Sequence, residues 1–191
     1  MIRRSGLIWD TNLVFSRFIE ECGVPCEHVT PHMLAAPFFR GHYTALIVPT
    51  GFGHPTYSNL LPALRASGSR IRRFAEGGGR VLVFGAADDR RNPYDWLPFN
   101  LEYTHNYGQG RVEVAKGHEC STILHDYDES TIECDGFFHL HDADVVATSE
   151  GKAVMVARSV GDGMIVVTCI HEYPSRDFIR EFCTAARETL F

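Results

Sequence analysis

The chain has 191 residues, of which 45% are hydrophobic and 22% charged, and its formal net charge is -6. We expect residues 1–191 to form a single domain, because one core can bury most of the apolar surface at this length, and the composition excludes disordered and collagen-like chains. The negative charge disfavours nucleic acid as a partner, since such a surface repels phosphates, and favours a small-molecule ligand or a protein.

The start of the chain has only a short apolar run before Asp10, too little for a signal peptide. No segment approaches the roughly 18 to 20 apolar residues that a membrane helix needs. We therefore expect a cytoplasmic protein without membrane contact; no cofactor is predicted, and the sequence allows a homo-oligomer. The six cysteines lack metal-site spacing and are expected to be reduced and mostly structural: Cys22, Cys26, Cys120, Cys134, Cys169 and Cys183.

The first half of the chain alternates apolar β-like runs with segments of helical period, a pattern typical of a parallel sheet covered on both faces. A helix is expected between the first two strands, capped by Asp10, Thr11 or Asn12 and stopped by Gly23. Two separate helical pieces are expected between the third and fourth strands, one over 60–64 and one over 71–75. The predicted strands cover residues 6–9, 24–30, 43–48 and 80–84.

The second half favours an antiparallel extension of this sheet. Its predicted strands cover residues 111–115, 131–138, 144–148, 153–159 and 164–170, and a last helix is expected after a cap at Ser175. The predicted fold class is therefore α/β, a flavodoxin-like three-layer sandwich with a mostly parallel central sheet and an antiparallel extension in the C-terminal half. The aromatic-rich segment 92–107 is either a contact surface or a segment folded back over the core.

Three sequence segments in order carry a resemblance to a known superfamily. They are ALIVPTGFG at 45–53, IRRFAEGGGRVLVFG at 71–85 and GDGMIVVTCIHE at 161–172. Together they resemble the class I glutamine amidotransferase-like superfamily, and within it the branch similar to the biotin-protein-ligase N-terminal domain and the ThuA-like proteins. The resemblance implies a nucleophilic cysteine on the turn after the fourth strand, with a base and an orienting carboxylate that here fall on His171 and Glu172.

The nucleophile of that superfamily is missing from this chain. Its position falls on Gly85 or Ala86, and residues 81–95 contain no Ser, Thr or Cys. His171 is followed at once by Glu172, where the superfamily separates the two by a proline. Neighbouring residues on a strand point to opposite faces, so Glu172 can orient His171 only if the chain leaves the strand, which Pro174 allows. We expect no covalent cysteine catalysis and regard His171 and Glu172 as a remnant of a triad.

The leading functional hypothesis is a non-catalytic or atypical amidotransferase-like domain that binds a small ligand or a partner protein. Open α/β sheets bind ligands at the carboxyl ends of their strands, where His171 is also expected. Two simpler interpretations stay open: the glycines at 51 and 53 only form a tight turn, and Asp88 and Asp89 are N-cap residues of a helix after the fourth strand. The predicted ligand-binding residues are Gly51, Gly53, His54, Gly85, Ala86 and Asp88.

Two alternatives come from other classes of function. The first is a metal- or acid/base-dependent hydrolase that uses His139, His141 and His171, because His139 and His141 would share one strand face. The competing interpretation of His139 and His141 is a pair of surface histidines, and no metal site is predicted from them. The second alternative is a structural subunit of a larger assembly.

Overall fold

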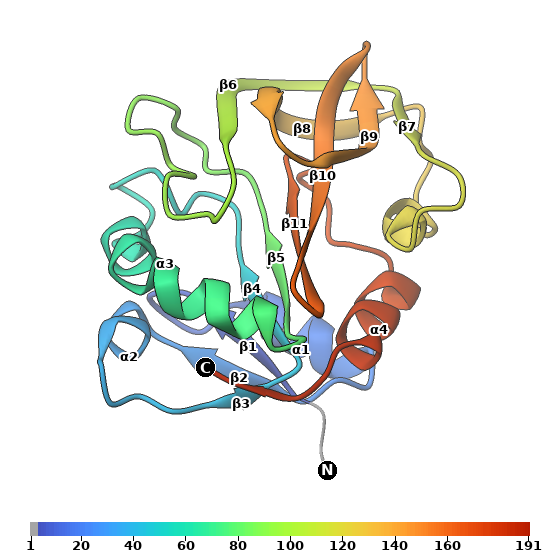
Figure 1. Ribbon diagram of the computed structural model, residues 1–191. Helices are drawn as coiled ribbons and strands as arrows, with labels where there is room; N and C mark the ends of the chain where they lie inside the picture. Colours follow the sequence, from blue (N-terminus) through green and yellow to red (C-terminus); the bar gives the residue numbers. More distant parts are fainter. Residues whose placement is uncertain (1–3) are drawn as a thin grey trace.

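The computed structural model describes residues 4–191, and a sheet of ten strands runs through its centre (Figure 1). Five neighbouring strands of this sheet are parallel and follow the order β2-β1-β4-β5-β11. This arrangement confirms the predicted flavodoxin-like α/β sandwich. The bounds of the parallel strands are β1 Ser5–Ile8, β2 Cys26–Val29, β4 Ala45–Val48, β5 Arg80–Val83 and β11 Gly163–Thr168.

The other five strands form an antiparallel extension, and the sequence predicted four of them. The predicted strand 164–170 was assigned to this extension wrongly, because β11 pairs parallel with β5, and β6 was not predicted. β10 pairs antiparallel with β11, and the sheet continues through β8 to β6, while β9 pairs with both β10 and β7. Figure 1 shows these strands gathered above the parallel part of the sheet. Their bounds are β6 Leu101–Gly110, β7 Val112–Val114, β8 Ile132–His141, β9 Asp144–Ser149 and β10 Lys152–Val160.

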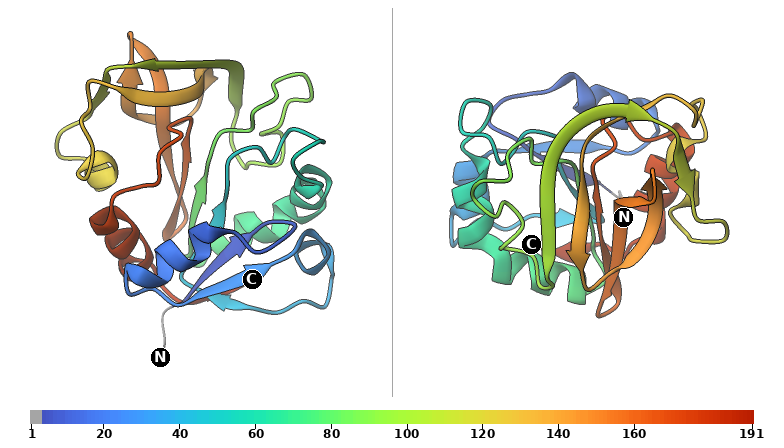
Figure 2. Two further views of the ribbon diagram at one scale, coloured as in Figure 1. Left: turned by 180° about the vertical axis from the view of Figure 1, so that it is seen from behind. Right: turned by 90° about the horizontal axis from the view of Figure 1, so that it is seen from above.

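Helices cover both faces of the parallel strands. On one face α1 lies beside α4, as Figures 1 and 2 show, and an ion pair joins Glu21 to Arg176 between them. On the other face α2 packs against α3. The bounds are α1 Val14–Glu21, α2 Pro31–Ala35, α3 Leu60–Glu76 and α4 Arg176–Ala185, with one 3-10 turn at Ser121–Leu124. Within residues 4–191, the structure contains no helix that could span a membrane.

The start of α1 differs from the prediction. Its first flanking residue is Leu13, which supplies no side-chain cap within the described structure. Asp10 points elsewhere: its carboxylate accepts hydrogen bonds from the Ser58 hydroxyl and, at 3.2 Å, from the backbone N–H of Asn59. The predicted cap of α1 is therefore wrong, because Asp10 instead satisfies donors at the beginning of α3.

The two helical pieces predicted between β4 and β5 are one helix, α3, which continues through Gly68. A Cβ at Gly68 would lie 2.8 Å from the carbonyl oxygen of Trp96, so glycine is needed here for a close contact and does not end the helix. The predicted third strand is divided into β4 and the short β3, His42–Tyr43, which pairs with β12, Thr189–Leu190. The predicted cap of α4 is confirmed, since Ser175 Oγ accepts from Phe178 N at 3.1 Å.

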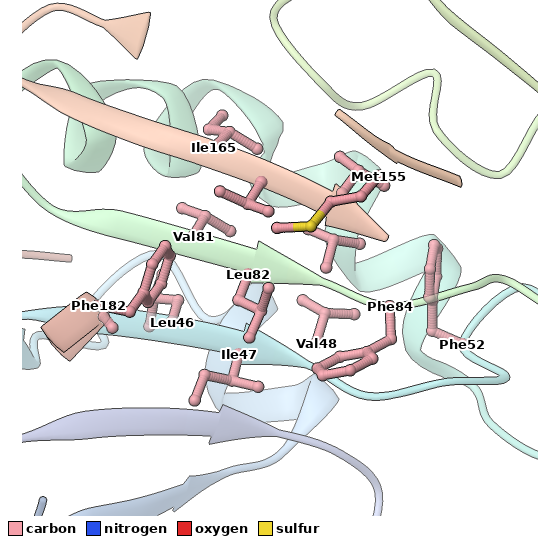
Figure 3. Packing of buried hydrophobic residues seen from close by; sticks show 14 of the residues in the cluster. Leu46, Ile47, Val48, Phe52, Val81, Leu82, Phe84, Met155, Ile165 and Phe182 are labelled. Atoms are coloured by element: carbon pink, nitrogen blue, oxygen red, sulfur yellow. The ribbon is translucent and has the colours of Figure 1, made fainter. Parts of the chain in front are cut away.

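The core lies on both faces of β4 and β5. Figure 3 shows apolar side chains from these strands packed against Phe84, Met155 and Phe182, and all of them are buried. Burying one such side chain stabilises the folded state by about 1.5–3 kcal/mol. Within the aromatic-rich segment 92–107, Trp96 and Tyr103 are buried too, which supports the interpretation of a segment folded back over the core.

Candidate functional site

The turns that follow β4 and β5 are joined by backbone hydrogen bonds. Gly51 N donates to Gly85 O at 2.8 Å, and Gly53 N donates to Ala86 O at 3.0 Å. Gly51 has a φ of 93°, which favours glycine, and a Cβ at Gly53 would lie 2.9 Å from Ala86. The N–H groups of Gly51 and Gly53 are thus used within the fold, which supports the interpretation of these glycines as turn residues.

A pocket of about 620 Å³ lies beyond these turns, at the carboxyl ends of β4 and β5. We call it the sheet-end pocket. Four predicted site residues line it: Gly51, His54, Asp88 and His171. Three others, Gly53, Gly85 and Ala86, support its wall without lining it. The remaining lining residues are Thr50, Tyr57, Ala87, Asp89, Arg90, His105, Tyr107 and Asp135.

The carboxylate of Asp135 fills the space above the predicted nucleophile position. Asp135 belongs to β8, and a Cβ on Gly85 would lie 2.0 Å from both of its carboxylate oxygens. Asp135 N donates to Cys169 O at 2.9 Å, which fixes β8 against the end of β11. The turn after β5 therefore carries no side chain at Gly85, and a carboxylate from another strand takes that place.

Asp135 is buried, with 2% of its surface exposed. Its Oδ2 accepts from Ala87 N at 3.3 Å, whereas its Oδ1 has no hydrogen-bond partner among residues 4–191. Burial raises the pKa of this carboxyl from 3.8 to about 6, although Tyr103, His105, the Ala87 N–H and His171 act in the opposite direction. A buried, incompletely bonded carboxyl group in a pocket is a candidate functional group.

The backbone at Ala87 adopts the left-handed conformation, with a φ of 56°. Such strain in a non-glycine residue is uncommon and often marks a functional turn. In hydrolases with a nucleophile elbow, the strained residue after the strand carries the nucleophile, and here that residue has only a methyl group. The sharp turn is therefore present, two residues beyond Gly85, without a reactive side chain.

Asp88 and Arg90 form an ion pair at the pocket wall. Arg90 Nε and Nη2 donate to the two oxygens of Asp88 at 3.1 and 2.8 Å, and Asp88 is buried. The hydrogen bonds from Arg90 lower the pKa of Asp88 to about 2. Asp88 also accepts from the backbone N–H of Arg90 at 2.9 Å. No helix begins between β5 and β6 in the described chain, so the predicted helix N-cap role of Asp88 and Asp89 is wrong, and Asp88 instead bonds within a turn at the pocket wall.

Two histidines of the pocket have assignable tautomers when neutral. His54 Nδ1 accepts from the Thr56 N–H at 3.2 Å, so the proton of a neutral ring lies on Nε2. His105 Nδ1 lies 2.7 Å from the carbonyl oxygen of Asp135, which can only accept, so the neutral ring carries its proton on Nδ1. His54 therefore offers a donor at Nε2, and His105 offers an acceptor at the same atom.

His171 reaches the pocket, but Glu172 is engaged elsewhere. The His171 ring packs edge-on against Tyr107 with centroids 6.0 Å apart. Glu172 Oε1 accepts from the Glu133 N–H at 2.8 Å, and Glu172 does not line the sheet-end pocket. Glu172 thus fastens β8 to the segment after β11, and the triad-like pairing of His171 with Glu172 stays a prediction.

His139 and His141 do not join His171 in the pocket. His139 Nε2 lies 3.0 Å from a Glu102 carboxylate oxygen, and His141 Nδ1 bonds to the Ala143 carbonyl at 2.9 Å. Across the described residues, no group of three or more His, Cys, Asp or Glu side chains is arranged to hold a metal ion. These contacts fit the interpretation of both residues as surface histidines.

Three of the lining residues that sequence reasoning missed come from β6 and β8. They are His105, Tyr107 and Asp135, and no motif links them in sequence. β6 was not predicted because its outer half, 105–110, contains two glycines and several polar residues and is mostly exposed. One signal was present, since Asp135 lies between Cys134 and the apolar residues 136–138, which is the pattern of a buried polar group with a specific role.

No protein-family model matches the sequence, and no curated protein matches it. Solved structures with a similar fold include a putative GMP synthase component from Thermoplasma acidophilum, with a TM-score of 0.64 and 15% identity over 97% of this chain and 94% of that one. A cytoplasmic protein from Salmonella typhimurium has a TM-score of 0.53 and 13% identity over 96% and 99%.

The similar structures also include parts of larger enzymes. A β-galactosidase from Rahnella sp. R3 has a TM-score of 0.57 and 14% identity over 96% of this chain. The chain spans only 30% of the length of that β-galactosidase. At these identities the similarity is one of fold.

Proposed function

We propose that this chain is an amidotransferase-like domain that binds a small polar ligand in the sheet-end pocket and performs no cysteine chemistry. One observation carries the proposal: the buried Asp135 carboxylate occupies the place above Gly85 where a nucleophile would stand. A hydrogen-bonding group thus occupies the place where the resemblance implies a reactive one.

The cysteines of the chain support the absence of thiol catalysis. Those nearest to Asp135 are Cys134 and Cys169, and both are buried. Burial raises the pKa of Cys134 to about 12 and that of Cys169 well above its usual value, with neighbouring carboxyl groups adding to the effect. Thiols with such pKa values form almost no thiolate at neutral pH and are poor nucleophiles.

The dimensions and lining of the pocket fit a small molecule. Ligand sites in proteins usually have about 300–1,000 Å³, a largely apolar wall and a few polar groups that fix orientation. Here the polar groups are His54 with a donor, His105 with an acceptor and the Asp135 carboxylate. The exposed rings of Tyr57 and Tyr107 add stacking surface.

A thermal-shift screen of the tag-free protein against metals, nucleotides, amino acids and biotin-like acids tests this function. Binding to the folded state raises the melting temperature by mass action. We expect a shift that is lost in His171→Ala, which removes a pocket side chain, and kept in His139→Ala, which removes a histidine outside the pocket. Equal shifts in both variants would place binding elsewhere; no shift with any compound, together with a co-purifying protein, would favour a partner protein.

Acid/base hydrolysis is a second candidate. The observation that favours it is Asp135, whose pKa of about 6 suits proton transfer near neutral pH. In such a hydrolase, Asp135 would be the acid/base group, the role that the sequence analysis gave to His139 and His141. Hydrolysis of an ester or glycoside library should then rise with pH through about 6 and disappear in Asp135→Asn; activity that survives in this variant would exclude the assignment.

A further inference from the structure

The floor of the sheet-end pocket presents two acceptors that the fold leaves unused. Asp135 is 2% exposed, and its Oδ1 has no partner within residues 4–191. His105 Nε2 carries a lone pair when the ring is neutral, since Nδ1 donates to the Asp135 carbonyl at 2.7 Å. A buried acceptor without a partner is costly, so this floor is suited to a ligand that brings hydrogen-bond donors.

No lysine or arginine among residues 4–191 forms an ion pair with Asp135, and the groups of opposite charge that act on it are His105 and His171 when they are protonated. Arg90 is the arginine of the pocket, and its Nε and Nη2 both donate to Asp88. With a pKa of about 6, Asp135 is ionised in most molecules at pH 7.5. An ammonium group would supply the opposite charge together with three donors, and charge-assisted hydrogen bonds of this kind are the stronger ones.

An apolar groove of about 330 Å³ adjoins the pocket. The two cavities share Thr50 and His171, so a ligand can extend from one into the other. We call this cavity the side groove. Its outer wall is formed by Val14, which is 77% exposed, and by the Tyr173 ring, which stacks on Phe15 at 4.5 Å.

From this arrangement we infer that the ligand is a primary amine with an apolar substituent. Its ammonium group bonds to the Asp135 carboxylate and to His105 Nε2, and its substituent passes His171 into the side groove. The inference rests on the proposed ligand-binding function and specifies the chemical class of the ligand. It excludes carboxylic acids, because a second carboxylate beside Asp135 would be repelled.

Isothermal titration calorimetry at pH 7.5 with phenylethylamine, 2-phenylethanol and 3-phenylpropanoate tests the head group. The three probes share a ring and a chain and differ in the charge and donors of the end group. We expect the amine to bind at least about tenfold more tightly than the alcohol, since hydrogen bonds to a charged group outweigh neutral ones. Binding of the propanoate should be undetectable.

Two variants and one control locate the contacts. Asp135→Asn keeps the shape of the side chain and should abolish the preference for the amine over the alcohol. Glu102→Gln removes a carboxylate outside the pocket and should leave it unchanged. Val14→Ser changes an exposed residue of the side groove, so phenylethylamine should bind about two- to tenfold more weakly, while propylamine, which is too short for the groove, should be unaffected.

The possible outcomes separate this inference from the function on which it rests. Equal binding of amine and alcohol, or an amine preference that survives in Asp135→Asn, would overturn the inference. If the thermal-shift screen finds a neutral or anionic ligand that requires His171, the amine class is wrong and the ligand-binding function stands. If no compound of either experiment binds, both are rejected.

Discussion

The carboxylate of Asp135 and the Cα of Gly85 are in such close contact that each residue restricts the other. A Cβ on Gly85 would lie 2.0 Å from both Asp135 carboxylate oxygens. No unusual φ demands glycine at this position, since Gly85 is not among the positive-φ glycines of the described chain. The restriction at Gly85 therefore comes from the neighbouring carboxylate.

Gly85→Ala should lower the free energy of unfolding by about 1–3 kcal/mol, because a methyl group must displace a buried side chain. In an Asp135→Ala background the same substitution should cost much less, whereas in Asp135→Asn, which keeps the bulk of the side chain, the cost should persist. Urea unfolding of the single and double variants measures this coupling. Additive effects in the alanine pair would show that the two residues do not compete for space.

The stability contributed by Asp135 should fall as the pH rises. Its pKa in the folded protein, about 6, lies above the ordinary value of 3.8, so the folded state binds this proton more tightly than the unfolded chain. The contribution is therefore complete below about pH 4 and lost as the pH rises through about 6. A shift of this size corresponds to about 3 kcal/mol.

Urea unfolding of the wild type and Asp135→Asn at pH 4, 5, 6 and 7 measures this dependence. The free energy of unfolding of the wild type, relative to the variant, should decrease across that range. Titrations far from Asp135 cancel in the difference between the two proteins, which therefore reports Asp135 together with His105 and His171, whose charges interact with it. Parallel curves for the two proteins would mean that the carboxyl has an ordinary pKa.

Arg90→Ala should make the protein more sensitive to acid. The hydrogen bonds from Arg90 hold the pKa of Asp88 at about 2, so their contribution to stability is present above the ordinary value of 3.8 and lost as the pH falls toward 2. Without Arg90 this contribution to stability is lost. The midpoint of acid unfolding, followed by circular dichroism, should therefore move to higher pH. The exposed neighbour Arg91 is the control, and Arg91→Ala should leave the midpoint in place.

Asp10→Ala should destabilise the start of α3. The Asp10 carboxylate bonds to the Ser58 hydroxyl and the Asn59 N–H, and loss of such a capping interaction costs about 0.5–2 kcal/mol. Thr11→Ala changes an exposed neighbour that the sequence also offered as a cap, and it should be nearly neutral. A larger cost for Thr11→Ala than for Asp10→Ala, measured by thermal unfolding, would restore the sequence-based cap of α1.

Most helices and strands could be predicted from the sequence because the patterns that indicate them involve neighbouring residues. The apolar strands β4 and β5 and the Ser175 cap each appear as short patterns of neighbouring residues. Errors arose where a distant contact decided the outcome. Gly68 resembles a helix break until Trp96 approaches it, and Asp10 resembles a cap of α1 until Ser58 and Asn59 reach it.

Only part of the candidate site could be predicted from the sequence, because the rest of it depends on contacts between distant segments. Gly51, His54, Asp88 and His171 follow predicted strands, so the parallel sheet places them at one edge. Asp135 and His105 arrive from β8 and β6, whose pairing depends on register between segments about 30 residues apart. A pattern within one strand cannot indicate which side chain of another strand will face it.

The hydrogen bonds that join the turns at Gly51–Gly85 and Gly53–Ala86 have a consequence for engineering. They define the outline of the sheet-end pocket through main-chain atoms, which substitutions at His54, Tyr57 or Tyr107 leave untouched. Side chains at the rim can therefore be exchanged to accept new compounds while the frame keeps its shape, and the domain offers a compact starting point for the design of small-molecule sensors.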